Sequence, residues 1–118
     1  MIKRLDGPDK VTGAARFPAD LVRSDFLHAL IVFTDQPHAR LVKLDVAAAL
    51  ATPGVVDVLT ADDIPVNEYG LVYRDQPVLI GLGNELTAVA ENVSRWEADQ
   101  LCVVVAESRE AAREGAGA

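Results

Sequence analysis

The sequence contains a single cysteine, few aromatic residues, few basic residues and no long apolar run, and each shortage excludes a class of protein. With Cys102 alone, no disulfide can form within the chain, which favours a reducing, cytoplasmic compartment. Lys and Arg number 11 against 18 Asp and Glu, and the formal charge of −7 argues against nucleic acid or an anionic membrane surface as a partner. Aromatic residues make up 5% of the chain, so a core must consist mainly of Val, Leu, Ile and Ala.

Apolar runs are also short. None approaches the roughly 20 residues of a membrane-spanning helix, and no apolar stretch follows Lys3 and Arg4, so we predict neither a membrane anchor nor a secretory signal. A length of 118 residues suits one domain of roughly 100–150 residues. We therefore expect a single domain over residues 1–118, with an N-terminal arm at 1–20 and a tail at 115–118.

The hydrophobic pattern predicts an α+β fold with a small mixed sheet and two short helices, in the order β-β-α-β-irregular-β-α. Apolar or alternating runs predict strands at 26–33, 39–44, 55–60 and 100–106. Helices are expected at 46–51, with Asp45 as the cap, and at 109–114, with Ser108 as the cap. Residues 5–13 are rich in Gly, Pro and Asp and are expected to form a loop. Residues 77–80 are a candidate strand, and 86–97 fit a strand or a poor helix.

The residues that could carry chemistry are few and far apart. We interpret His28 as a hydrogen-bonded histidine in the core or at a sheet edge, and Cys102 as a packing residue in a buried strand. Asp62 and Asp63 follow a strand and precede Pro65, a position that favours capping a turn over ligating a metal. Because the sequence also lacks a phosphate loop, a dinucleotide turn and a nucleophile elbow, we predict no catalytic, cofactor-binding or metal-binding residue.

Four residues are instead candidates for an interface. Pro37, His38 and Arg40 form a polar turn that could contact a partner, and Trp96, the only tryptophan, could anchor either a local cluster or an interface.

Four stretches of sequence carry a resemblance to a known family. They read RLDGPDKVTG (4–13), PHAR (37–40), DVAAALATPGVVDVLTADDIP (45–65) and VVVAESREAA (103–112). In this order they resemble the α/β hammerhead domain that opens the molybdopterin-binding subunit of xanthine dehydrogenases and aldehyde oxidases. The chain departs from the family at 33–36, where a basic residue, Ser and Pro are usual, and at 95–100, where the usual Gly and Pro are missing. These departures affect loop contacts and leave the substrate type undefined.

The resemblance implies a parent enzyme that hydroxylates heterocycles or aldehydes with water, using a molybdenum-pterin centre, iron–sulfur clusters and FAD. In this family the catalytic and cofactor residues lie mainly in later domains, so the resemblance carries no catalytic residue over to this chain. The expected role is a structural and interaction domain that packs on the molybdopterin-binding domains, near the iron–sulfur and flavin subunits or domains, and shapes the substrate approach. An isolated chain would then be inactive and would expose surface that allows self-association.

Two alternatives remain open at this point. One is a free-standing small enzyme with a metal held by His38, Asp62 and Asp63. The other is a separately encoded small subunit of a molybdenum hydroxylase.

Overall fold

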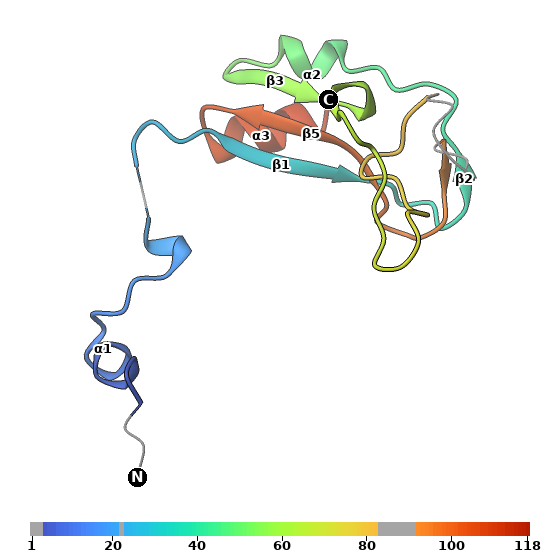
Figure 1. Ribbon diagram of the computed structural model, residues 1–118. Coiled ribbons are helices and arrows are strands. Elements are labelled where there is room, and N and C mark those ends of the chain that lie inside the picture. The colour runs from blue at the N-terminus through green and yellow to red at the C-terminus, as the bar shows by residue number, and fades with distance from the viewer. Residues whose placement is uncertain (1–3, 22, 83–91) are drawn as a thin grey trace.

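The computed structural model describes residues 4–21, 23–82 and 92–118, and shows two small sheets with short helices (Figure 1). The helices are α1 (Gly7–Thr12), α2 (Ala47–Ala51) and α3 (Arg109–Ala116), and single 3₁₀ turns form at η1 (Pro18–Asp20) and η2 (Ala61–Asp63). The strands are β1 (His28–Phe33), β2 (Ala39–Arg40), β3 (Val55–Leu59), β4 (Val93–Ser94) and β5 (Gln100–Ala106). One sheet has the order β1-β5-β3, and β2 pairs with β4 in the other.

The core lies between the larger sheet and the two helices α2 and α3. Along the central strand β5, Cys102, Val104 and Ala106 are buried while the alternate residues are half-buried, as the two-residue period of a strand requires. Cys102 and Val104 pack with Ala49 of α2 and Val58 of β3, whereas Ala106 packs with two alanines of α3, Ala111 and Ala112. The apolar run that predicted this strand therefore supplies the centre of the core.

Helix α3 lies very close to the sheet because it has a glycine at the contact. A Cβ added to Gly115 would lie 2.7 Å from Val55 Cγ2 and 3.2 Å from Val104 Cγ1. The helix begins where Ser108 Oγ accepts a hydrogen bond from the Ala111 backbone N–H at 3.1 Å. The cap predicted at Ser108 is confirmed, and the helix continues through Ala116 rather than ending at residue 114.

The predicted fold class and the main strands are confirmed, but the mixed sheet is not. All the described pairings are antiparallel. The strands β1 and β3 run parallel to each other and are joined through α2, which normally produces parallel neighbours. Here β5 lies between them and pairs antiparallel with both, so the parallel contact never forms.

Residues 5–13 were expected to form a loop, and this prediction is wrong because they contain α1. Pro8 lies in the first turn of the helix, where its missing N–H is not needed. Asp6 forms an ion pair with Lys10 at 2.7 Å, and Gly13 ends the helix with a left-handed φ of 74°. The same residues that suggested a loop thus mark the two ends of a short helix.

Three other predictions need correction. The strand expected at 39–44 contains only β2, because its partner β4 offers two residues and the chain then turns away. Residues 77–80 form no strand, although Leu79 and Ile80 are buried. Of the segment 86–97, residues 86–91 lie outside the described residues, and the rest contains the two-residue β4 followed by a turn.

Among the described residues, no helix has the length and apolar character needed to cross a membrane.

Candidate functional site

The structure brings the four predicted interface residues to one end of the molecule. Pro37 and His38 are exposed in the turn that leads into β2, and Arg40 is exposed on β2 itself. Trp96 lies in the turn after β4, the strand paired with β2, and is 67% exposed. We call residues 34–40 and 92–99 the paired turns. Among the described residues, Trp96 is therefore not part of a buried cluster, and most of its side chain is exposed.

Backbone hydrogen bonds hold the paired turns side by side. The Thr34 N–H donates to the Asp99 carbonyl and the Ala98 N–H donates to the Thr34 carbonyl, both at 2.9 Å. The Asp99 carboxylate accepts from the Arg95 and Trp96 backbone N–H groups at 2.7 and 3.1 Å. These bonds hold Ala98 at a φ of 72°, which alanine rarely adopts. Trp96 is thus displayed on a turn of fixed shape.

A buried serine links the paired turns through hydrogen bonds to the backbone. Ser94 is 4% exposed, and its hydroxyl accepts from the Ala39 N–H and donates to the Gln36 carbonyl, both at 2.9 Å. Ser94 could not be predicted from the sequence, because a serine in a two-residue strand has no local pattern that marks it. Arg40 adds a 3.3 Å hydrogen bond to Asn92 Oδ1 across the same pair of strands.

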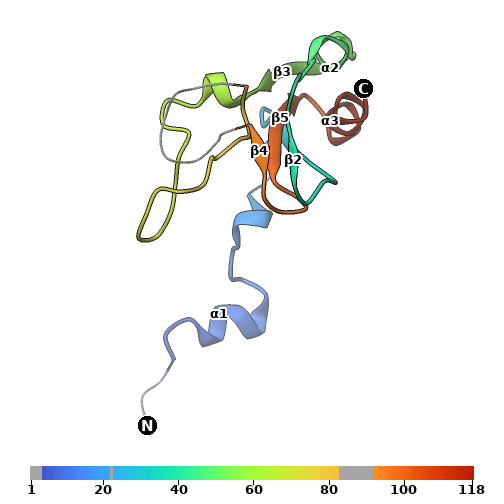
Figure 2. The ribbon, with the colours of Figure 1, turned by 90° about the vertical axis from the view of Figure 1, so that its right-hand side faces the viewer.

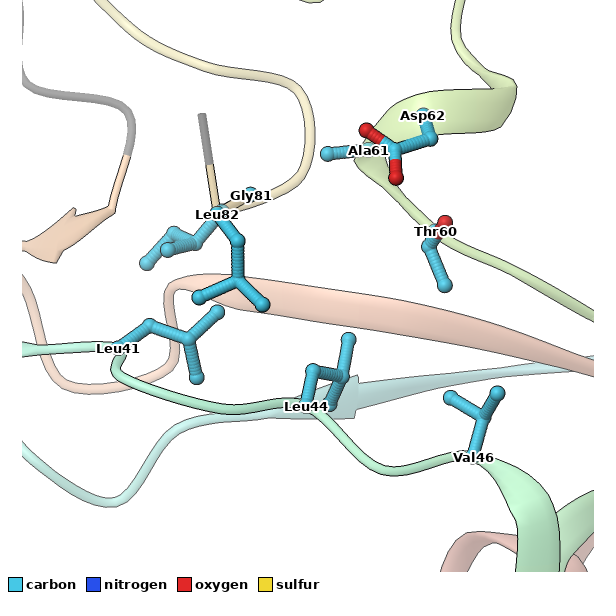
Figure 3. A pocket seen from close by; sticks show the side chains of 9 residues that line it. Leu41, Leu44, Val46, Thr60, Ala61, Asp62, Gly81 and Leu82 are labelled. Carbon is cyan, nitrogen blue, oxygen red and sulfur yellow. The ribbon is translucent and has the colours of Figure 1, made fainter. Parts of the chain in front are cut away.

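A cavity of about 90 Å³ lies beside η2 and is largely apolar (Figure 3). Leu41, Leu44 and Val46 form one wall, and Leu82 faces them from the other side. Its polar side chains are Thr60 and Asp62, and Ala61, Ile80 and Gly81 complete the lining. A cavity of this size and lining holds a few water molecules or one small apolar group rather than a substrate for polar chemistry.

Of the acidic pair beside this cavity, Asp63 caps the turn as predicted, whereas Asp62 lines the cavity. Asp63 Oδ2 accepts hydrogen bonds from the Thr60 backbone N–H at 2.7 Å and the Thr60 hydroxyl at 3.0 Å. These bonds favour the carboxylate and hold the pKa of Asp63 below its ordinary value. Within the described part of the chain, no three His, Cys, Asp or Glu side chains come close enough to hold a metal ion. His38, Asp62 and Asp63 are therefore not brought together as a metal site.

The remaining candidates occupy ordinary structural positions. Cys102 is 5% exposed, and burial raises the pKa of its thiol, which agrees with a packing role. His28 is half-buried at the start of the edge strand β1, beside a hollow that Arg109 and Arg113 also border. The edge position was predicted, but no described residue forms a hydrogen bond with its imidazole.

Sequence reasoning also missed a buried amide and an exposed loop. Asn67 is 1% exposed, and its side chain donates to the Leu79 carbonyl at 2.7 Å and accepts from the Leu79 N–H at 2.8 Å. Between these residues, Tyr69 and Gln76 pair as a narrow hairpin that exposes Leu71, Val72 and Tyr73 at its tip. The three consecutive apolar residues at 71–73, framed by Gly70 and Arg74-Asp75, were the available signal for an exposed tip.

Comparison with known proteins identifies the family. Residues 12–118 match the family described as "Aldehyde oxidase and xanthine dehydrogenase, a/b hammerhead domain". The chain belongs to this family. It is 34% identical over 112 residues to the nicotinate dehydrogenase large molybdopterin subunit of Eubacterium barkeri, a match that covers 94% of this chain and 24% of that protein.

Two solved structures share the fold over almost the whole chain. Quinoline 2-oxidoreductase from Pseudomonas putida 86 superposes with a TM-score of 0.74 at 33% identity, covering 98% of this chain and 15% of that one. The aldehyde oxidoreductase from Desulfovibrio desulfuricans ATCC 27774 superposes with a TM-score of 0.75 at 30% identity, covering 98% and 13%. The chain thus spans a quarter or less of the length of these relatives, and the resemblance stated from the sequence is confirmed.

Proposed function

We propose that this chain serves as a non-catalytic docking domain of a molybdenum-pterin hydroxylase, packing on the cofactor-binding parts of the enzyme and shaping the substrate approach. The observation that carries the proposal is the family match over residues 12–118 in proteins at least four times as long as the matched region. In such a parent enzyme the remaining length would hold the molybdenum-pterin centre, with iron–sulfur clusters and FAD as electron carriers.

The distribution of apolar side chains supports a docking role. Among the described residues, 18 large hydrophobic side chains are exposed, while the buried hydrophobic core has ten members. The exposed ones include the hairpin tip at 71–73 and Trp96 on the paired turns, and Figure 1 shows the hairpin projecting away from α2 and α3. Contiguous exposed apolar residues of this kind mark surfaces that other protein covers.

The cavity beside η2 does not fit a molybdenum-pterin cofactor. Its volume of about 90 Å³ is far below the 300–1,000 Å³ of typical ligand sites, and its polar side chains, Thr60 and the acidic Asp62, offer no positive charge to the phosphate of the cofactor. We therefore assign no catalytic step to this cavity, and propose that cofactor and substrate bind elsewhere in the parent enzyme.

The test is reconstitution. The 118-residue chain would be mixed with the molybdopterin-binding subunit of its source organism, produced without the hammerhead segment, and both complex formation and hydroxylase activity would be measured. We expect a one-to-one complex by sedimentation, with activity in the mixture and none in either part alone. Trp96→Ala should weaken the complex, because a large exposed ring on a fixed turn is typical of an interface anchor. The exposed Val42→Ala is the matched control.

Two results would contradict this function. Stoichiometric metal in the purified chain, together with turnover by the chain alone, would favour the small metal enzyme. A chain that stays separate from the truncated subunit at micromolar concentrations would exclude the docking role. Recovery of a native complex in which the chain is a separate polypeptide would identify it as a small subunit with the same docking role.

A further inference from the structure

The segment that precedes β1 is folded locally, but none of its residues is buried in the part of the chain that the structure describes. We call residues 4–27 the leading segment; it contains α1 and η1 and runs away from the sheet (Figures 1 and 2). None of its described residues is buried. The exposed fractions of its apolar side chains are large: 96% for Leu5, 86% for Val11, 54% for Phe17 and 56% for Leu21.

Five of the eight charged side chains of the leading segment form ion pairs with each other. Asp6 forms ion pairs with Arg4 at 2.6 Å and Lys10 at 2.7 Å, and Arg23 pairs with Asp25 at 2.8 Å. Among the described residues, no hydrogen bond or ion pair joins residues 4–25 to residues 28–118. What the segment offers outward is therefore chiefly its apolar side chains.

Charge separates the leading segment from the rest of the chain. Residues 4–27 contain four Lys and Arg against four Asp, a formal charge of zero. We call residues 28–118 the body of the domain. The body contains six Lys and Arg against fourteen Asp and Glu, a formal charge of −8. A neutral segment with exposed leucine, valine and phenylalanine fits an apolar, weakly charged groove, and it gains no attraction from the acidic body of a second copy.

Helix α1 needs such a groove to be stable. It has six residues, whereas isolated helices shorter than about 12–15 residues are marginal in water. Its ion pair is exposed and contributes little. Because no residue of α1 is buried by the described part of the chain, its stabilising surface must lie outside the described residues.

The solved relatives indicate where that surface lies. The superpositions on quinoline 2-oxidoreductase and the aldehyde oxidoreductase each cover 98% of the chain, so they include nearly all of the leading segment. In both enzymes, 85% or more of the chain lies outside the matched region. This remaining protein is large enough to offer the surface that the leading segment lacks in its own chain.

We propose that the leading segment is a docking segment, which inserts Val11 and Phe17 into an apolar groove on the part of the molybdopterin-binding subunit outside this chain. Helix α1 becomes stable on insertion. This inference rests on the proposed function and adds to it the element that attaches the domain to its partner.

The experiment measures binding of the full 118-residue chain to the molybdopterin-binding subunit lacking its hammerhead segment. Val11→Asp and Phe17→Asp should each weaken binding at least tenfold, and the double variant about a hundredfold, because each removes one buried apolar side chain and places a charge there. Val42→Asp, at a residue of the body that is 83% exposed, is the matched control and should bind as the wild type does. Both leading-segment variants should melt at the wild-type temperature, since neither position contributes to the core.

Hydrogen exchange provides a second readout. The backbone amides at the end of α1 should exchange rapidly in the free chain and at least tenfold more slowly in the complex. Wild-type binding with full affinity retained in both Asp variants would overturn the docking segment while leaving the proposed function intact. Failure of the wild-type chain to bind would overturn both. A self-association of the chain that Val11→Asp abolishes would assign the segment to a second copy and overturn this proposal.

Discussion

Replacement of Asn67 by alanine should loosen the segment that closes the cavity beside η2. Asn67 is the only described side chain that bonds both backbone groups of Leu79, at 2.7 and 2.8 Å, and Leu79 is 2% exposed. In the alanine variant the Leu79 N–H and carbonyl lose these partners in a place that water does not reach. Each unsatisfied buried group costs about 1–3 kcal/mol, so the two together should cost at least about 2 kcal/mol.

Urea denaturation followed by far-UV circular dichroism measures this loss. For a domain of this size the slope with urea is about 1–3 kcal/mol/M, so the midpoint should fall by roughly 1–2 M. The Leu79 amide should also exchange with solvent at least tenfold faster in native conditions, even if the segment opens without global unfolding. Gln36→Ala removes an exposed amide and is the matched control, with a change within about 0.5 kcal/mol.

An Asn67→Ala variant that keeps the wild-type urea midpoint and the wild-type exchange rate of the Leu79 amide would refute this prediction. Wild-type protection of the Leu79 amide from hydrogen exchange in Asn67→Leu would refute it as well, because leucine fills the space without offering either hydrogen bond. Such results would show that packing alone fixes residues 79–81.

Three further predictions address the core, the buried thiol and the capped turn. Gly115→Ala should destabilise the domain by about 1–2 kcal/mol, since the close contact with Val55 Cγ2 outweighs the better helix propensity of alanine. Val55→Ala removes that contact, so the double variant should lose about 1 kcal/mol less unfolding free energy than the sum of the two single losses. Cys102 should react with iodoacetamide at pH 8 at least a hundredfold more slowly in the native chain than in urea, because burial raises the pKa of the thiol and blocks access. Because the pKa of Asp63 is lower in the folded state, its carboxylate contributes stability above about pH 4, and that contribution is lost as the pH falls through the folded pKa. The melting temperature of Asp63→Asn should therefore approach that of the wild type between pH 6 and pH 3, and a constant gap would contradict the linkage.

The elements that could be predicted from sequence are those whose signal is local. The run of β-branched residues at 103–105 predicts β5, and Ser108 predicts the start of α3, because each depends only on near neighbours. Helix α1 could not be found in this way, since it has no buried face and therefore no apolar period. Residues 77–80 were misread because Leu79 bonds to the side chain of Asn67, twelve residues away, instead of to a strand.

The same distinction applies to the candidate site. Pro37, His38, Arg40 and Trp96 could be selected singly as turn or surface residues, but their convergence depends on the pairing of β2 with β4. Ala39 and Ser94, which meet in that pair, are 55 residues apart, and no local pattern specifies such a contact. The exposure of the leading segment could not be predicted from the sequence either. It depends on the whole fold, and apolar residues in a segment do not by themselves indicate that the segment is exposed.

Stability and docking therefore reside in different residues of this chain, and the variants can separate them. Asn67 and Gly115 are surrounded by the chain's own atoms, so their replacement should lower the unfolding free energy while the folded fraction still binds the partner subunit. Val11 and Phe17 contribute to no core, so their replacement by aspartate should weaken binding while the melting temperature stays unchanged. A small domain whose body is acidic and whose leading segment is neutral and apolar is suited to this division, because the charge keeps the body dispersed while the segment attaches it. If Val11→Asp lowered the melting temperature as much as Asn67→Ala does, the leading segment would pack on its own body in solution, and the division would be wrong.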